Sequence, residues 1–166
     1  ISKTRIPQFG NSSIWETIET YKDIDILTNI DFDKTVSDYY KYLIHTQFEN
    51  RDISNGNIYL EINGITSNDY NYVCYQNIFR WVRLRKKDRQ NKFLLSQIKA
   101  VCVADTQYVI NDSNTNITVY GNGVCTLAGN NNSMINGFVP AGRINRIRLY
   151  TDVCATGFVV LQGYRG

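Results

Sequence analysis

The feature that most constrains the fold of this chain is the pattern of its residues after position 52. Short runs rich in Val, Ile, Tyr and Phe alternate with Asn and Gly. Such runs are typical of strands, and the residues between them are typical of turns. About nine runs at intervals near ten residues, with no helical pattern between them, favour an antiparallel sandwich or partly closed barrel over a βαβ fold. The predicted strands are Ile58–Ile62, Tyr70–Gln76, Phe79–Arg85, Phe93–Val103, Tyr108–Ile110, Ile117–Tyr120, Val124–Leu127, Ile144–Tyr150 and Gly157–Gln162.

Three segments are candidates for the hairpin turns between these strands. Asn63-Gly64 separates two predicted strand segments, Ile58–Ile62 and Ile65-Thr66, and Asn136-Gly137 separates Met134-Ile135 from Phe138-Val139. Asn-Gly accepts the positive φ angles of a type I′ turn, so both pairs predict tight hairpins. Residues 86–91 are predicted to close a third hairpin.

The first third of the chain has a different pattern. Ser13 to Glu16 matches a capping box, which predicts a short helix over residues 13–22. Apolar side chains then recur at helical spacing after Asp33, which predicts a second helix over residues 34–49. The expected fold class is therefore mainly β (α+β), an antiparallel sandwich or partly closed barrel with one or two N-terminal helices.

The length predicts one domain. A chain of 166 residues with 43% hydrophobic side chains is long enough to bury its own core. We expect residues 1–166 to form a single recognition domain cut from a larger or processed protein, because the chain starts at Ile1 and ends at Gly166. Its apolar runs are far shorter than the roughly 20 residues of a membrane helix, so no membrane insertion is predicted.

Residues that could support catalysis are sparse. His45 is the only histidine, and no Gly-x-Ser-x-Gly motif accompanies it. No Gly-rich nucleotide-binding motif occurs. Residues 112–116 resemble the start of a calcium loop, but Ile117 replaces the glycine that such loops require. We therefore expect neither enzymatic activity nor a cofactor nor a metal site.

The four cysteines are Cys74, Cys102, Cys125 and Cys154, and each follows a valine. No C-x-x-C pair occurs, which disfavours a zinc site. Buried strand thiols and at least one disulfide both fit this pattern.

Charge is distributed unevenly along the chain. Residues 1–79 carry 6 basic and 11 acidic groups, whereas residues 80–166 carry 12 and 4. The densest basic run, residues 80–89, places Trp81, Arg83 and Arg85 on one face of a predicted strand. Arginines interleaved with an aromatic ring can bind nucleic acid, but no RNA-binding or zinc-finger motif supports that partner.

A second basic group lies near the C-terminus. In the predicted strand 144–150, Arg146, Arg148 and Tyr150 share the face opposite Ile147 and Leu149. Guanidinium groups can bind a carboxylated or sulfated glycan. Trp81, Arg83, Arg85, Arg146, Arg148 and Tyr150 are therefore the predicted ligand-binding residues.

A small β domain with many Tyr and Asn residues suits non-enzymatic surface recognition. Its length, its Ile, Asn and Tyr content, and the Trp-bearing run Phe79–Arg85 followed by the long run from Phe93 resemble the receptor-binding head of a rotavirus spike protein. That resemblance implies viral attachment at the virion surface or a secreted location, with a host cell-surface glycan or protein receptor and a parent spike or capsid protein as partners.

The predicted N-terminal helices and the four Val-Cys pairs depart from the galectin-like fold of the rotavirus heads, and no ligand-binding residue of that family is transferred to this chain. Two other functions fit the sequence. One is a secreted bacterial toxin or effector subunit. The other is a structural capsid or filament subunit whose acidic and basic halves meet between copies.

Overall fold

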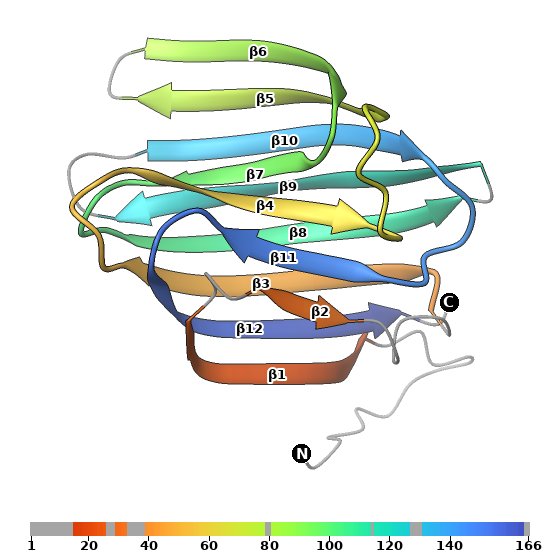
Figure 1. Cartoon of the computed structure of the whole chain (residues 1–166), viewed down its shortest axis with the longest axis horizontal. Coiled ribbons are helices and arrows are strands. Elements are labelled where there is room, and N and C mark those ends of the chain that lie inside the picture. The colour runs from red at the N-terminus through yellow and green to blue at the C-terminus, as the bar shows by residue number, and fades with distance from the viewer. Residues whose placement is uncertain are drawn as a thin grey trace, which may run out of the picture.

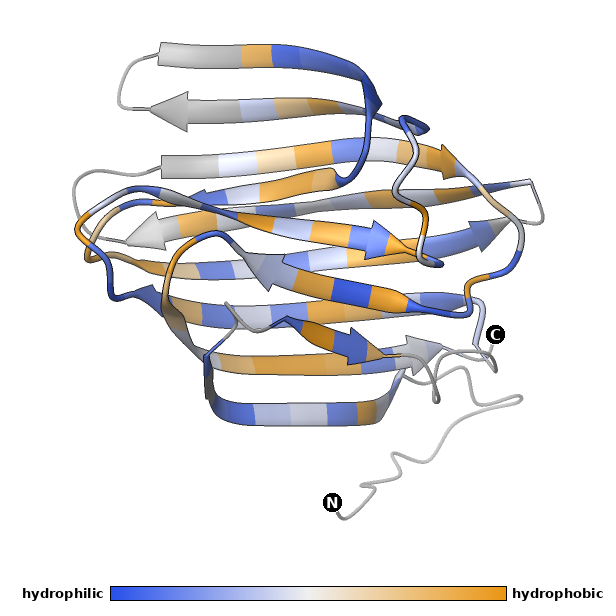
Figure 2. Ribbon diagram, viewed as in Figure 1, coloured by the Kyte–Doolittle hydropathy of each residue, from blue (hydrophilic) through white to orange (hydrophobic). Residues whose placement is uncertain are grey.

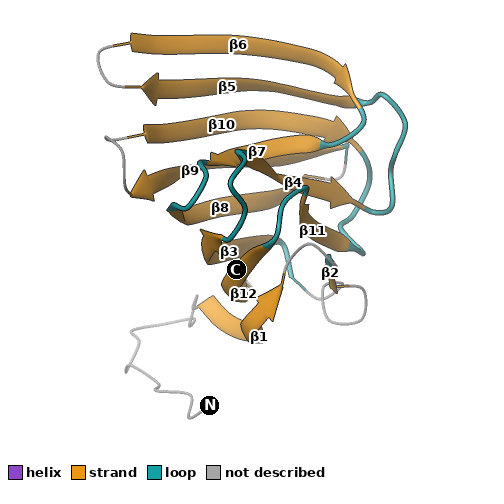
Figure 3. Ribbon diagram, turned by 60° about the vertical axis from the view of Figure 1, so that its left-hand side comes forward, coloured by secondary structure: helices purple, strands orange, loops and turns teal. Residues whose placement is uncertain are grey.

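The computed structural model describes residues 15–25, 29–32, 39–78, 81–113, 115–126 and 131–164. Every regular element within these residues is a strand (Figure 3). None of these residues belongs to a helix that could cross a membrane. The strands are β1 (Trp15–Asp25), β2 (Ile30–Phe32), β3 (Lys41–Asn50), β4 (Gly56–Ile62), β5 (Tyr70–Ile78), β6 (Trp81–Gln90), β7 (Phe93–Ile98), β8 (Val103–Ser113), β9 (Asn116–Thr126), β10 (Asn131–Pro140), β11 (Ile147–Thr151) and β12 (Ala155–Tyr164).

The strands form two antiparallel sheets that pack face to face (Figure 1). The larger sheet has the order β1-β12-β3-β8-β9-β10-β5-β6, and the smaller has the order β2-β11-β4-β7. β7 lies against β9 and β10, where it joins the two layers. The described residues therefore form an all-β sandwich.

Alternation along the strands builds the core between the sheets. In β3, every second side chain from Tyr42 to Asn50 is buried, including Ile44 and Phe48, and the alternate side chains are more exposed. In β11, Ile147 and Leu149 point inward, and Figure 2 shows the hydrophobic and hydrophilic residues of this strand in alternation. Because side chains on a strand point to opposite faces in turn, each sheet has one apolar inner face and one outer face available to ligands.

The expected mixture of helices and strands is wrong. Residues 15–22, predicted as helix, belong to β1, and residues 41–49 belong to β3; residues 13, 14 and 34–38 lie outside the described part. In β3, Ile44 and Phe48 of the predicted helical stripe also fit a period of two, whereas Leu43 does not. Pairing with β12 and β8 on both sides decides between these patterns, because tertiary packing overrides a local helical preference.

Only one of the three predicted turns is a turn. Asn63 and Gly64 have φ angles of 54° and 67°, as a type I′ turn requires, although no strand follows at residues 65–66. Asn136-Gly137 lies instead in the middle of β10. A Cβ on Gly137 would lie 2.4 Å from Cβ of Tyr72 and 2.9 Å from Cε1 of Phe93. Glycine at this position therefore allows Tyr72 and Phe93 to pack directly against the β10 backbone.

The predicted hairpin at residues 86–91 is also wrong, because β6 continues through Lys86 and Lys87 to Gln90 before the chain turns into β7. As a result, β6 forms a long, charged edge of the larger sheet.

Candidate functional site

The predicted C-terminal binding residues lie on the smaller sheet. Arg148 and Tyr150 point outward from β11, and Arg146 immediately precedes this strand. The turn at Asn63 fixes the start of β11, because Asn63 Oδ1 accepts hydrogen bonds from the backbone nitrogens of Asn145 (2.8 Å) and Arg146 (3.2 Å). The structure thus places Arg146, Arg148 and Tyr150 along one outer face.

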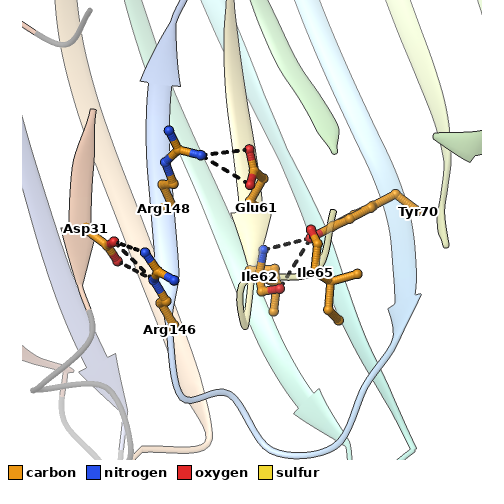
Figure 4. Close-up of polar contacts among 7 residues, drawn as sticks. All are labelled: Asp31, Glu61, Ile62, Ile65, Tyr70, Arg146 and Arg148. Carbon is orange, nitrogen blue, oxygen red and sulfur yellow. Dashed lines mark hydrogen bonds and ion pairs between the residues drawn. The ribbon is translucent and has the colours of Figure 1, made fainter. Parts of the chain in front are cut away.

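Both arginines on this face are engaged by carboxylates of neighbouring strands (Figure 4). Arg146 Nε donates to both oxygens of Asp31 at 2.9 and 3.0 Å, and its Nη2 bonds the same carboxylate. Arg148 Nη1 lies 3.3 Å from both oxygens of Glu61. The hydrogen bond from Arg146 lowers the pKa of Asp31. These pairings cancel much of the positive charge that an anionic glycan would need.

Two tyrosines complete this face. The rings of Tyr59 on β4 and Tyr150 on β11 have centroids 5.4 Å apart. Lys92 Nζ lies 4.4 Å from the Tyr59 centroid, and Arg148 Cζ lies 4.6 Å from that of Tyr150. Burial, followed by the interaction with Glu61, raises the pKa of the Tyr150 hydroxyl. We name this surface, consisting of Asp31, Tyr59, Glu61, Lys92, Arg146, Arg148 and Tyr150, the β11 face.

The other three predicted binding residues lie on the larger sheet. Trp81, Arg83 and Arg85 belong to β6, the strand at one edge of that sheet. Arg85 is exposed and stands opposite Cys74 of β5, whereas the side chains of Trp81 and Arg83 lie outside the described part. The six predicted residues therefore belong to two sheets and do not form one site.

A groove that the sequence did not predict crosses the outer face of the larger sheet. It has a volume of about 520 Å³ and extends over β9, β10, β5 and β6. We name it the β10 groove, and its lining residues are Asn71, Tyr72, Val73, Lys86, Asp88, Thr118, Asn136, Gly137 and Phe138.

The strand register determines how the β10 groove is built. Phe138 stands opposite Thr118 on β9 and Asn71 on β5, so a hydroxyl and an amide flank its ring. One row along, Asn136 stands opposite Val73. Phe138 is 42% exposed, which leaves a large part of its aromatic surface available to a ligand.

Polar groups surround this aromatic centre. The side chains of Asn136 and Thr118 form no hydrogen bond with any residue that the structure describes. Asn71 is fixed, because its Oδ1 accepts from the backbone nitrogen of Arg89 and its Nδ2 donates to the carbonyl of Asp69, both at 3.1 Å. Lys86 Nζ lies 3.6 Å from Asp88 Oδ2, so the two charges of the lining cancel. The groove can therefore offer hydrogen bonds without a net charge.

The β10 groove could not be recognised in the sequence because its residues are far apart in the chain. They fall between residues 71 and 138 on four strands, and only the register aligns them. The one available signal was the exposed Phe138 beside Asn136-Gly137, and the expectation of a turn concealed it.

A second hollow of about 440 Å³ lies on the same outer face, toward the β1 edge. Phe158 lines it together with acidic and amide groups from β1 and β3. Arg51 also lines this hollow, and its Nε donates a hydrogen bond to Thr156 Oγ1 at 3.1 Å. An internal hydrogen bond thus already engages the guanidinium of this smaller hollow.

The residues considered for chemistry have structural partners. His45 Nε2 lies 3.0 Å from Asp105 Oδ1, and its ring packs edge-on against Phe158. Asp112, the first residue of the calcium-like segment, accepts a hydrogen bond from the backbone nitrogen of Ile144. Across the described ranges, no three His, Cys, Asp or Glu side chains gather as a metal site would require.

The described cysteines are thiols. Cys74, Cys102 and Cys154 form no disulfide, and burial raises the pKa of Cys74. The Sγ of Cys154 bonds the carboxylate of Asp25. The side chain of Cys125 lies outside the described part.

No protein-family model and no curated protein matches this chain. Solved structures that match this chain include the galectin LEC-6 of Caenorhabditis elegans, which has a TM-score of 0.37 and 9% identity over 89% of this chain and 96% of that one. The homodimeric agglutinin CG-16 from chicken liver has a TM-score of 0.33 and 8% identity over 78% and 98% of the two chains. The carbohydrate-binding module CBM66 of Bacillus subtilis has a TM-score of 0.28 and 9% identity over 95% and 98%. At these scores the likenesses carry no conclusion about the ligand of this chain.

Proposed function

We propose that this chain is a non-enzymatic recognition domain that binds an uncharged glycan in the β10 groove. The observation that carries the proposal is the half-exposed ring of Phe138, held in an open groove between the hydroxyl of Thr118 and the amide of Asn71. A pyranose ring has an apolar C–H face that packs on aromatic side chains. Its hydroxyls both donate and accept hydrogen bonds, as do amide and hydroxyl side chains.

The size and polarity of the groove support this ligand class. Ligand sites are typically clefts of about 300–1,000 Å³ in which apolar side chains are joined by a few polar groups. The β10 groove falls within this range at about 520 Å³. Asn136 and Thr118 supply side-chain groups that no described residue occupies.

Charge favours an uncharged glycan over a sialylated or sulfated one. An anionic group is bound most strongly by unpaired guanidinium or ammonium groups. In the β10 groove Lys86 is paired with Asp88, and on the β11 face Arg146 and Arg148 are paired with Asp31 and Glu61. An anionic ligand that binds Lys86, Arg146 or Arg148 would have to displace an internal carboxylate.

The proposed biological setting is attachment to a host cell, with the domain on a virion or in secreted form. The resemblance to rotavirus spike heads suggests this setting, and a glycan displayed on a cell surface is a ligand that suits it. A protein receptor is the alternative partner and is one outcome of the experiment below.

The experiment is a glycan array that includes neutral, sialylated and sulfated glycans, probed with the wild-type chain and two variants. Phe138→Ala removes the aromatic centre of the groove. Met134→Ala is the matched control, because Met134 lies on the same face of β10, is 53% exposed and is not part of the groove lining. We expect binding to neutral glycans that Phe138→Ala weakens at least tenfold and Met134→Ala leaves unchanged.

Selective binding of sialylated or sulfated glycans would contradict the proposed ligand class. Glycan binding that survives in a folded Phe138→Ala variant would contradict the proposed site. Binding to intact cells that enzymatic deglycosylation leaves unchanged would indicate a protein receptor instead.

A further inference from the structure

The two edges of the larger sheet carry opposite charges. β1 contains four acidic residues and Lys22, which gives this strand a net charge of −3. β6 contains five basic residues and Asp88, which gives a net charge of +4. Figures 1 and 3 show these strands at opposite ends of the sheet. The acidic residues are Glu16, Glu19, Asp23 and Asp25, and the basic residues are Arg83, Arg85, Lys86, Lys87 and Arg89.

Edge strands have one side on which backbone N–H and C=O groups can pair with another chain. Among the described strands, β1 pairs only with β12, and β6 pairs only with β5. The strands are also similar in length, with 11 and 10 residues. Each can therefore accept a further strand by β-augmentation.

Charge decides which edge-to-edge contact between two copies is favourable. Pairing β1 with β1 would bring two acidic strands together, and pairing β6 with β6 would bring two basic strands together. Like charges on neighbouring strands destabilise a sheet, whereas opposite charges stabilise it. Of the contacts between the two edges of the larger sheet, only the pairing of β1 with β6 brings opposite charges together.

We propose that β6 is a docking edge for β1 of a second copy of this chain, so that the larger sheet continues from one molecule to the next. The contact joins two different surfaces, so each bound copy still presents one edge for another partner. Head-to-tail contacts of this kind form rings or open chains rather than closed two-fold dimers.

The geometry of the two strands limits the strength of this contact. β1 has register shifts after Thr17 and Tyr21, whereas β6 is regular from Trp81 to Lys87 and irregular only near Arg89. Such bulges interrupt strand pairing at edges. The contact therefore depends on protein concentration and on charge, and it weakens when salt screens the charges.

The test is analytical ultracentrifugation of the complete chain over a range of concentrations at low ionic strength, repeated in 1 M salt, where the Debye length is about 3 Å. The β6 variant Arg85→Glu/Lys87→Glu removes the net charge of that edge, and neither residue lines the β10 groove. The β1 variant Thr17→Lys/Thr20→Lys adds two positive charges at exposed positions. Circular dichroism verifies that both variants fold.

We expect the mass of the wild-type chain to rise with concentration at low salt and to return to that of a monomer at high salt. Each variant alone should associate at least tenfold more weakly. A 1:1 mixture should form a heterodimer that grows no further, because each variant still has one intact edge and those two edges are complementary.

A wild-type chain that stays monomeric at all concentrations would overturn the proposal. It would be overturned equally by variants that assemble as the wild type does, or by a mixture that remains monomeric. These outcomes are independent of glycan binding, so they do not depend on the function proposed for the β10 groove.

Discussion

Gly137 of β10 and Phe93 of β7 lie in contact across the interior of the sandwich, and a Cβ on Gly137 would approach Cε1 of Phe93 to 2.9 Å. The same Cβ would lie 2.7 Å from the backbone oxygen of Asn71. Since the neighbouring β5 backbone cannot move away without breaking its own pairing, this position requires the absence of a side chain. The close approach of β7 to β10 thus supports the strand that carries Phe138.

Gly137→Ala should therefore destabilise the fold. Overpacking a well-packed core typically costs about 1–3 kcal/mol. We expect the free energy of unfolding, measured by urea denaturation, to fall by about that amount. Asn136→Ala is the control, because Asn136 is exposed on the same strand and should change stability little. Equal stability of Gly137→Ala and the wild type would show that β10 and β7 are less closely packed than described.

The hydroxyl of Tyr70 bonds the backbone of two residues, Ile62 and Ile65, on either side of the Asn63-Gly64 turn (Figure 4). It accepts from the nitrogen of Ile62 at 2.9 Å and donates to the carbonyl of Ile65 at 2.8 Å. Tyr70→Phe leaves the buried nitrogen of Ile62 and the partly buried carbonyl of Ile65 without this partner, so we expect a loss of about 1–3 kcal/mol in the free energy of unfolding.

Tyr70 also predicts a pH dependence. Burial raises its pKa from 10.0 to about 12. The unfolded chain loses this proton near pH 10 while the folded chain retains it, so the contribution of Tyr70 to stability is complete below pH 10 and is lost as the pH rises toward 12. Tyr70→Phe should reduce the loss of stability between pH 10 and 12, whereas Tyr40→Phe, at an exposed position, should not. An identical decline in both variants would contradict this assignment.

Removal of the cation from the pair of Arg148 and Glu61 is expected to destabilise the fold because Glu61 is buried. The side chain of Glu61 is 7% exposed, and that of Arg148 is 35% exposed. Arg148→Gln leaves a buried carboxylate without its cation, so unfolding free energy should fall by about 1–3 kcal/mol. Adding Glu61→Gln should restore part of this loss, because the uncompensated charge disappears. If the double variant loses as much unfolding free energy as the two single variants lose in total, the two residues do not interact.

The same variant tests the predicted role of Arg148 in ligand binding. If the β11 face is structural, Arg148→Gln should retain glycan affinity once the difference in stability is taken into account. Loss of binding in the folded variant would instead support the sequence-based prediction for Arg146, Arg148 and Tyr150.

Some of the fold could be predicted from the sequence because its signals are local. The alternation of Ile147 and Leu149 with Arg148 and Tyr150 identified the two faces of β11. The segment 41–49 was misassigned because Ile44 and Phe48 satisfy both a helical period and a strand period, and only the neighbours β12 and β8 resolve the ambiguity.

The β10 groove could not be predicted because it is a property of register. Thr118, Phe138 and Asn71 meet on one row of three strands, and nothing in the sequence fixes that alignment. The pairing of Arg146 with Asp31 is similar, since it joins positions 115 residues apart. Such contacts change the expected ligand from anionic to uncharged.

The most direct test of the glycan-binding account is a titration of the best neutral glycan from the array into the isotopically labelled chain, followed by NMR of the backbone amides. The predicted result is that the changes in amide chemical shift cluster at Asn71, Thr118 and residues 136–138, while the chemical shifts of the β4 and β11 amides remain unchanged. Shifts that cluster instead around Tyr59, Arg148 and Tyr150 would contradict the β10 groove as the binding site and place the ligand on the β11 face.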